Sequence, residues 1–359
     1  MAINMRPVKI WPVLLCALVS GCSLQHHTDR AERSWLNAKL LSPELHSVSL
    51  TPEIASSADT VGEAFLTTSG ASTHLLGQIE SRDIDELSGM APVIGERDKY
   101  WAINDSGNKP QLFAINGSGK HFGKIDLPVL NRDWEDLATF DLNGENWIAI
   151  SETGDNVRRH SVSSIYFFKQ PDLKDLPKQL ELAYQLDFSY EDGPRNVESM
   201  SVSVRERRIY LISKDKTPRI YTLPLPAITA GDQTGKARVA RNAARYAGQL
   251  AKLQATNDDA WWERTFAASL LLTPTGLDFS AGDRMAVVSN YRHVYLFSRS
   301  GDETWAAALT RAPKILTSHR MEQSESVAFS ADGREVIVSS EGVNAPLLTI
   351  RPSVAAARL

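Results

Sequence analysis

Residues 135–168 carry the pattern that decides the fold. Glu135–Ala138 (EDLA) opens this stretch, Trp147–Glu152 (WIAISE) follows, and Ile165–Phe168 (IYFF) closes it. The second and third runs are rich in β-branched and aromatic residues, and polar turn-forming residues separate them, as is typical of strands. The stretch therefore predicts three consecutive antiparallel strands.

The same order of three runs occurs five times along the chain. The opening segments share a small-or-acidic, apolar, small pattern: Ser88–Ala91, Glu135–Ala138, Glu198–Ser201, Thr275–Asp278 and Glu325–Ala328. Each second run ends in a polar pair: Asn104-Asp105, Ser151-Glu152, Ser213-Lys214, Ser289-Asn290 and Ser340-Glu341. A three-strand meander repeated at this length predicts an all-β protein built as a single β-propeller.

Five blades are visible, and the alternative is a sixth blade in the long gap before Thr275. The apolar residues of that gap recur at helical spacing, which favours an amphipathic insertion around residues 226–270, with an outer strand as the other interpretation. The spaced residues are Val239, Ala243, Tyr246, Leu250 and Leu253.

The fifth repeat contains only three strands before the chain ends. We expect Leu75–Glu80, at the front of the domain, to supply its fourth strand and close the ring, because an open ring would leave exposed strand edges. The propeller is then predicted to span residues 73–352, followed by a C-terminal tail at 353–359.

The N-terminus has the features of a signal segment. Arg6 and Lys9 precede a short apolar run, and the segment ends in Val19-Ser20-Gly21-Cys22, which resembles the bacterial lipobox. That resemblance implies cleavage of residues 1–21, acylation of Cys22, and anchoring to a lipid bilayer. The alternative is an ordinary cleavable signal with an incidental cysteine.

Ser23 follows the lipobox cysteine, and this choice of residue implies a bacterial outer-membrane lipoprotein that faces the periplasm. Residues 22–72 are polar and are expected to form a flexible tether between the lipidated cysteine and the propeller.

Composition argues against several other classes of function. The formal net charge is -4 and no block of basic residues is present, which argues against nucleic acid as a partner. The sequence also lacks a serine nucleophile elbow, a catalytic cysteine motif and a phosphate-cradling glycine loop.

Propeller geometry predicts where the acidic residues meet. The start of each inner strand and the end of each second strand lie on one face of the ring, close to its axis. Inner strands bring Glu135, Glu198 and Glu325, with Glu86 two residues before its own segment; second strands bring Asp105, Glu152, Lys214, Asn290 and Glu341. Carboxylates from at least four blades are therefore predicted to converge on this face, here called the axial face.

Convergent carboxylates repel one another and need compensation. Protonation, pairing with Lys214 or nearby arginines, or a bound cation would each supply it. Oxygen ligands suit calcium, or magnesium, and the tentative metal ligands are a subset of Glu86, Asp105, Glu135, Glu152, Glu198, Glu325 and Glu341. The competing interpretation is that most of these side chains only bond the backbone of the neighbouring blade.

The polar loop that follows Glu152 is predicted to lie on the same face. Arg158 and Arg159 in this loop could grip a phosphate or carboxylate, and Lys214 and Asn290 complete the predicted ligand-binding set. For a catalytic function, Glu135 and Glu198 are the tentative acid–base residues.

Several of these motifs together resemble a group of poorly characterised secreted bacterial β-propeller lipoproteins. The resemblance covers roughly residues 75–352 and rests on Glu86–Met90, Asn104–Gly107, Asp133–Ala138, Gly154–Asn156 with Arg158-Arg159, and Ser340–Gly342. More distantly, the chain is similar to calcium-dependent gluconolactonase-like and phytase-like propellers. The resemblance implies a propeller with an acidic axial site, and no individual metal ligand is transferred from it.

Three functions follow as hypotheses. The first is a lipid-anchored propeller that binds a cation and a polar or anionic small molecule at the axial face. The second is a metal-dependent hydrolase of phosphoester or lactone type. The third is an envelope scaffold, which would need an exposed apolar patch.

Overall fold

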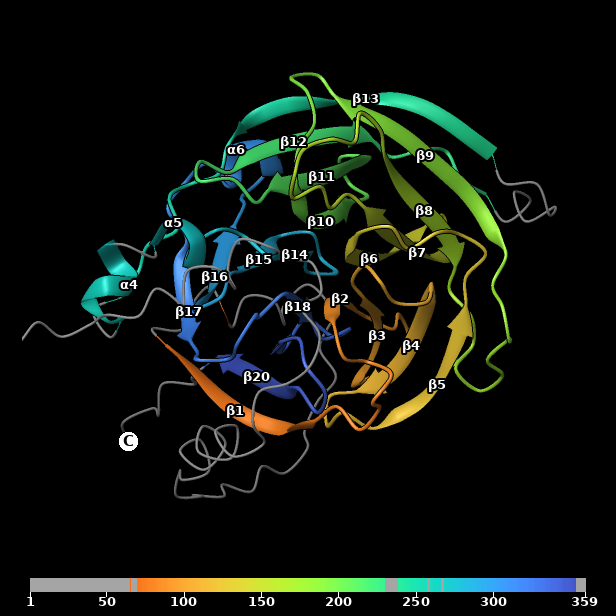
Figure 1. Ribbon diagram of the computed structural model, residues 1–359, viewed down its shortest axis with the longest axis horizontal. Coiled ribbons are helices and arrows are strands. Elements are labelled where there is room, and N and C mark those ends of the chain that lie inside the picture. Colours follow the sequence, from red (N-terminus) through yellow and green to blue (C-terminus); the bar gives the residue numbers. More distant parts are fainter. Residues whose placement is uncertain (1–64, 66–69, 230–237, 257–258, 266–267, 353–359) are drawn as a thin grey trace, which may run out of the picture. The chain divides into compact units, whose positions relative to one another are not determined.

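The computed structural model describes residues 65, 70–229, 238–256, 259–265 and 268–352, which belong to one structural unit, Ser56–Leu359. The predicted signal segment, Cys22, most of the predicted tether and the C-terminal tail lie outside the described residues. Within the described part, strands dominate and form a β-propeller (Figure 1).

The described residues form five blades of four strands, each ordered from the axis outwards. The first blade contains β2 (Leu87–Pro92), β3 (Lys99–Asn104), β4 (Gln111–Asn116) and β5 (His121–Asp126). The second contains β6 (Trp134–Leu142), β7 (Glu145–Glu152), β8 (Ser163–Lys169) and β9 (Leu182–Tyr190). The third contains β10 (Val197–Ser203), β11 (Arg208–Ser213), β12 (Arg219–Pro224) and β13 (Arg238–Gln249).

The last two blades complete the ring. The fourth contains β14 (Gly276–Phe279), β15 (Met285–Ser289), β16 (His293–Ser298) and β17 (Lys314–Ser318). The fifth contains β18 (Ser326–Phe329), β19 (Val336–Ser339), β20 (Pro346–Pro352) and β1 (Ala71–Gln78). The innermost strands β2, β6, β10, β14 and β18 surround the centre of the view in Figure 1.

The N-terminal strand closes the ring, as the sequence predicted. β1 pairs antiparallel with β20, from Ala71 opposite Pro352 to Gln78 opposite Pro346. The strand begins and ends slightly earlier than the predicted Leu75–Glu80 segment. Both ends of the propeller thus share one sheet, and β1 covers the outer edge of β20 that would otherwise be open.

The predicted amphipathic helix in the long gap before Thr275 is wrong, and its alternative, an outer strand, is present. β13 pairs antiparallel with β12 and parallel with β9, the outer strand of the second blade, so two blades share one eight-stranded sheet. The gap therefore holds an outer strand and the short helices α4 (Trp261–Thr265) and α5 (Ala268–Leu271) in place of a sixth blade.

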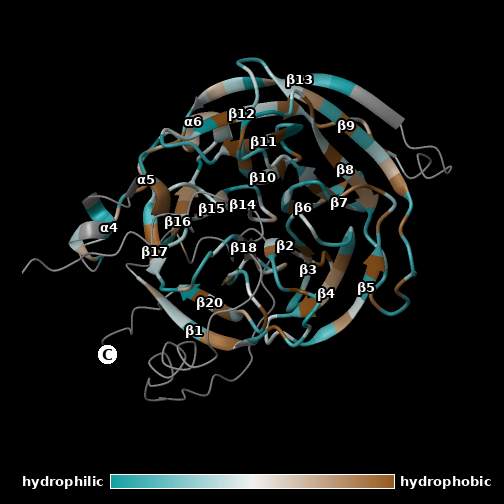
Figure 2. Cartoon of the chain, viewed as in Figure 1, coloured by the Kyte–Doolittle hydropathy of each residue, from teal (hydrophilic) through white to brown (hydrophobic). Residues whose placement is uncertain are grey.

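Hydrophobic side chains of neighbouring blades pack against one another and form the core. One cluster joins Trp147 and Phe167 of the second blade to Met200 and Leu211 of the third, and all four are fully buried. Burying such a side chain stabilises the fold by roughly 1.5–3 kcal/mol. Hydrophobic colour follows the blade strands in Figure 2, whereas many loops are hydrophilic.

Two glycines make room for close contacts of the inner strands: Gly89 of β2 lies against β6, and Gly276 of β14 lies against β15 of its own blade. A Cβ on Gly89 would lie 2.9 Å from the Asp136 Cα, and a Cβ on Gly276 would lie 2.8 Å from Ser289 Oγ. These positions explain the small residues in the repeated opening segment. Among the described residues, no helix is both long and apolar enough to cross a membrane.

Candidate functional site

Two buried acids at the axis are fully committed to the backbone of neighbouring blades. Asp136 Oδ2 accepts the N–H groups of Met200 and Leu277, at 2.9 and 3.2 Å, and so ties β6 to β10 and β14. Asp278 Oδ2 accepts the Phe329 N–H at 2.8 Å and ties β14 to β18. These carboxylates are structural, which is the role that the competing interpretation assigned to the axial acids.

A second group of axial acids is compensated by a buried lysine. Lys214, at the end of β11, forms ion pairs with Glu198 and with Glu325 Oε1, the latter at 3.4 Å. Tyr291 receives a hydrogen bond from the lysine and donates one to Glu325 Oε1, each 2.7 Å long. Two opposing pKa shifts follow: burial raises the pKa of Glu198 to about 7, and for Glu325, despite burial, Lys214 lowers the pKa.

Glu341 extends this compensated group. Its Oε2 accepts a 2.6 Å hydrogen bond from the Gln323 side chain. Burial, and then the charge of Glu325, raise the pKa of Glu341 to about 10, so it is protonated at neutral pH. Lysine pairing and protonation, two of the compensations expected from the sequence, therefore balance this side of the axial face.

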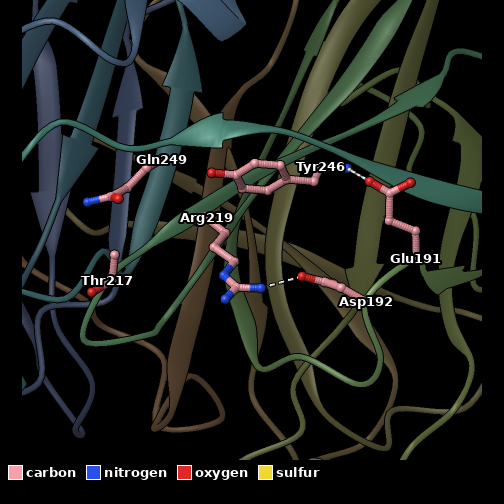
Figure 3. Close-up of a pocket in the computed structure, with 6 residues that line it drawn as sticks. All are labelled: Glu191, Asp192, Thr217, Arg219, Tyr246 and Gln249. Atoms are coloured by element: carbon pink, nitrogen blue, oxygen red, sulfur yellow. Dashed lines mark hydrogen bonds and ion pairs between the residues drawn. The ribbon is translucent and has the colours of Figure 1, made fainter.

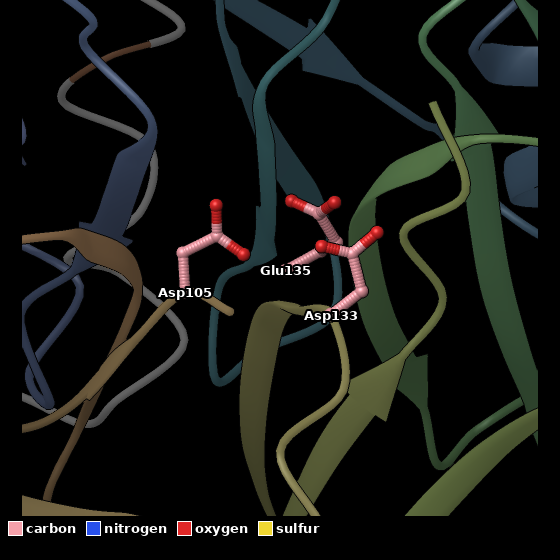
Figure 4. Close-up of side chains that lie close together, drawn as sticks. All are labelled: Asp105, Asp133 and Glu135. Carbon is pink, nitrogen blue, oxygen red and sulfur yellow. The ribbon is translucent and has the colours of Figure 1, made fainter. Parts of the chain in front are cut away.

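Three other acids lie together, and none of them is an ion-pair partner of Lys214 in the described part of the chain. Asp105 follows β3, Asp133 precedes β6 and Glu135 lies within it, and one carboxylate oxygen of each lies within 4.8 Å of the other two. Figure 4 shows the three carboxyl groups pointing toward one another. We call these residues the axial trio. Asp105 and Asp133 are half-buried, so the trio is in contact with solvent.

Loops of adjacent blades position the axial trio. Asn131 donates to the backbone carbonyl of Asp105 at 2.8 Å, which joins the first blade to the loop before β6. Glu152 accepts the N–H of Asp133 at 2.8 Å, and the Gly154 N–H donates to the Asp133 carbonyl at 3.1 Å. The backbone that carries the trio is therefore fixed on both sides.

Glu135 differs from the other buried axial acids because its carboxylate has no hydrogen bond or ion pair within the described part of the chain. Its side chain is only 4% exposed. Burial, and then the charge of Glu198, raise the pKa of Glu135 well above its ordinary value. Burial also raises the pKa of Asp105 to about 8 and shifts that of Asp133 upward. A buried, unpaired carboxylate is costly unless a proton or a cation neutralises it.

Gly154 makes room for the trio. A Cβ at this position would lie 2.5 Å from Asp133 Oδ2 and closer still to Glu135 Oε1. Gly154 does not have a positive φ, whereas Arg158 in the same loop does, at 53°. The glycine is therefore required for space around the carboxylates and not for a left-handed turn.

Other predicted metal ligands on this face have different partners. Glu152 accepts the N–H groups of Arg132 and Asp133 and forms a 3.2 Å ion pair with Arg132, so it fixes the loop before β6. Glu86 is exposed and accepts a 2.8 Å hydrogen bond from Asn108. Neither residue belongs to the axial trio.

Most of the predicted ligand-binding residues are also engaged elsewhere. Asn290 accepts the N–H groups of Arg292 and His293 and donates to Tyr295, so it shapes a turn. Arg158 pairs with Asp215. Lys214 forms ion pairs with Glu198 and Glu325, and Arg159 is exposed.

Sequence reasoning did not assign Asp133 to the site, although it included Asp105 and Glu135. Asp133 precedes the inner strand and was not at a repeated position, so the blade alignment gave no reason to select it. Strand alternation does not mark it either, because Asp133 precedes β6 and the pairing of β6 with β7 shifts register between Trp134 and Asp136.

A separate hollow lies at the outer side of the third blade. It has a volume of about 580 Å³ and is lined by Glu191, Asp192, Thr217, Arg219, Tyr246 and Gln249 (Figure 3). Arg219 pairs with Asp192, and Glu191 accepts the Tyr246 N–H at 2.7 Å. The acids of this hollow are thus paired, unlike Glu135.

The comparisons with known proteins do not indicate a function for this chain. No protein-family model matches the chain, and no curated protein matches it. A nidogen/laminin complex is 13% identical with a TM-score of 0.35, covering 72% of this chain and 73% of that one. The RRP9 WD40 repeats are 9% identical with a TM-score of 0.40, covering 78% of this chain and 97% of that one. The β-propeller assignment rests on the strand topology described above.

Proposed function

We propose that the axial trio binds a divalent cation, and that the chain is a propeller-type binding protein whose ligand site is the axial face. The observation that carries this proposal is Glu135, a carboxylate with 4% exposure, which lies beside two half-buried acids. Structural acids on the same axis, such as Asp136, have backbone partners. Among the described residues the oxygens of Glu135 have no such partner, so they are available to a cation.

Calcium fits the donor set best. The trio offers oxygen atoms only, and calcium takes six to eight oxygen ligands in flexible geometry, with water completing the shell. The half-buried Asp105 and Asp133 leave room for such waters. Magnesium demands near-ideal octahedral geometry and is the second choice. A cation at this point would also offset the repulsion among the three acids.

The test is calorimetric titration of the mature protein with calcium, and separately with magnesium, after dialysis against chelator. We expect one saturable calcium site per chain and loss of that site in Glu135→Gln. Asp278→Asn is the matched control, because Asp278 is a buried axial acid that accepts the Phe329 N–H and is not part of the trio, so its replacement should leave the calcium site in place. If neither calcium nor magnesium gives a saturable binding signal in the titration, the proposal is wrong.

A metal-dependent hydrolase is the second proposal, and one observation favours it. Asp105 has a pKa of about 8 and lies in the trio, so near neutral pH it could exchange a proton with a substrate held by the cation. Turnover of generic phosphoesters or lactones that requires calcium and falls in Asp105→Asn would support this proposal. Calcium binding without such turnover would leave the binding protein as the function.

Anchoring to the bacterial outer membrane through Cys22, with the propeller in the periplasm, is a further part of the proposed function. It rests on the lipobox-like sequence that ends in Cys22. Cys22→Ser should move the protein from the membrane fraction to the soluble fraction. Unchanged membrane fractionation would contradict the anchor. The envelope-scaffold hypothesis stays a prediction.

A further inference from the structure

A second polar group lies on the outer strands of the fourth blade and joins residues far apart in the sequence. His293 begins β16, Ser318 ends β17, and the two residues pair directly across the strands. Asp259 lies in the segment before α4. His293 Nδ1 is 3.0 Å from Ser318 Oγ, and His293 Nε2 is 2.9 Å from Asp259 Oδ2.

The three side chains differ in their exposure to solvent. Asp259 and His293 are buried, whereas Ser318 is exposed. The carboxylate is also fixed in place: Asp259 Oδ2 accepts the Thr256 N–H at 2.6 Å and the Thr256 hydroxyl at 3.2 Å. The hydroxyl of the exposed Ser318 therefore contacts the buried imidazole of His293. The other ring nitrogen of His293 lies next to the anchored carboxylate of Asp259.

The ring nitrogen that carries the proton can be deduced from these contacts. Burial lowers the pKa of His293, so the imidazole is neutral at pH 7 and carries one N–H. Nε2 lies 2.9 Å from Asp259 Oδ2, although off the line of a hydrogen bond, and a bare lone pair there would repel the carboxylate, so we assign the proton to Nε2. Nδ1 then presents its lone pair to Ser318 and accepts the serine O–H.

We propose that Ser318 is a nucleophile, with His293 as its general base and Asp259 as the residue that orients the base. The order hydroxyl, imidazole, carboxylate is that of an activated serine, recognised by roles and not by sequence position. The substrates would be carboxylic esters that can reach the exposed end of β17.

The reaction balances with water as the second reactant. Ser318 Oγ forms a bond to the ester carbonyl carbon, and its proton passes to His293 Nδ1. The C–O bond of the ester breaks and the alcohol leaves with that proton, which gives an acyl-serine. Water then attacks the acyl carbon while His293 Nδ1 takes its proton. The bond between that carbon and Ser318 Oγ breaks, and Oγ regains the proton from His293 as the carboxylic acid leaves. No metal takes part, so this site is independent of the axial trio.

The experiment uses a fluorophosphonate probe on the mature protein, at pH 7.5 and in chelator. Labelling forms the Ser318 Oγ–P bond and expels fluoride. We expect one labelled peptide, containing Ser318, and no labelling of Ser318→Ala. Because a general base contributes about 10²–10⁴-fold, His293→Gln should slow labelling at least about 100-fold. Asp259→Asn should also slow it, with p-nitrophenyl acetate hydrolysis falling in parallel.

Ser298→Ala is the matched control, because Ser298 is an exposed serine at the end of β16 in the same sheet. This variant should label like the wild type. Thermal melting checks that each variant folds, and Asp259→Asn serves if His293→Gln does not fold. Wild-type labelling no faster than that of Ser318→Ala would overturn the proposal. Labelling of Ser318 that is unchanged in folded His293→Gln, or in Asp259→Asn, would do so too.

Discussion

Glu135→Gln should stabilise the protein without a cation and lose most of this advantage when calcium is bound. The substitution removes one negative charge from the axial trio and nearly keeps the shape of the side chain. Because the folded-state pKa of Glu135 is raised, its contribution to stability is fully present below the ordinary value of 4.5 and is lost as the pH rises toward the folded value.

The size of the effect without cation follows from that shift. Each pH unit between 4.5 and the folded pKa costs the wild type about 1.4 kcal/mol of unfolding free energy, so the cost at pH 7 is up to about 3 kcal/mol. Glutamine carries no such cost. In chelator at pH 7, Glu135→Gln should therefore be more stable than the wild type, and the two should converge near pH 4.5.

Calcium should cancel most of this advantage. At a calcium concentration about 100 times the dissociation constant, the wild type gains about 2.7 kcal/mol, and the variant gains little because it lacks one ligand. The assay is urea unfolding followed by tryptophan fluorescence, in chelator and in calcium, at pH 4.5 and pH 7.

Asp278→Asn is the control for this assay, because the Asp278 carboxylate accepts the Phe329 N–H and ties β14 to β18 away from the trio. It should destabilise the protein by about 1–3 kcal/mol, equally with and without calcium. A Glu135→Gln variant that loses stability equally in chelator and in calcium would refute the reasoning, because Glu135 would then be a structural acid like Asp278.

Three further substitutions test neighbouring parts of the account. Gly154→Ala places a Cβ 2.5 Å from Asp133 Oδ2, and should weaken calcium binding about tenfold or more (about 1.4 kcal/mol) in calorimetry; unchanged affinity would show that the trio tolerates displacement. Lys214→Met leaves Glu198 and Glu325 buried together, and should lower the unfolding free energy by about 3 kcal/mol or more in urea at pH 7; a neutral result would contradict the compensated group. Asp136→Ala removes an acceptor shared by three blades, and should lower the melting temperature whether or not calcium is present; a calcium-dependent effect would argue against a structural role.

The blade pattern was predictable because it is local. Each strand is a short β-prone run between polar turns, and the repeat order fixes which strand is innermost. Ring closure by the N-terminal strand followed from the three-strand repeat at Glu325. In contrast, the apolar residues of β13 recur at intervals that also fit a helix. This segment forms a strand because it pairs with β9 and β12.

The convergence of the axial acids was also predictable, since equivalent positions in blades meet at the axis. Their individual roles were not, because these depend on which groups lie opposite each carboxylate. Glu152 faces backbone amides and Glu325 faces Lys214, whereas Glu135 faces neither. Partners of this kind come from distant loops, so no local pattern marks them.

Ser318, His293 and Asp259 illustrate the same limit. The absence of a nucleophile elbow in the sequence argued against covalent catalysis, but that motif describes only one way to present a serine. Here the contacts arise from cross-strand pairing of β16 with β17 and from the return of the chain before α4. Neither contact leaves a sequence spacing that could be recognised.

The most direct test of the central claim is an anomalous difference map from crystals of the mature protein grown with millimolar calcium. The account predicts one strong peak about 2.3–2.6 Å from oxygens of Asp105, Asp133 and Glu135, the range of calcium–oxygen bonds. A map without a peak among these three carboxyl groups, or with the groups turned away from one another, would contradict it.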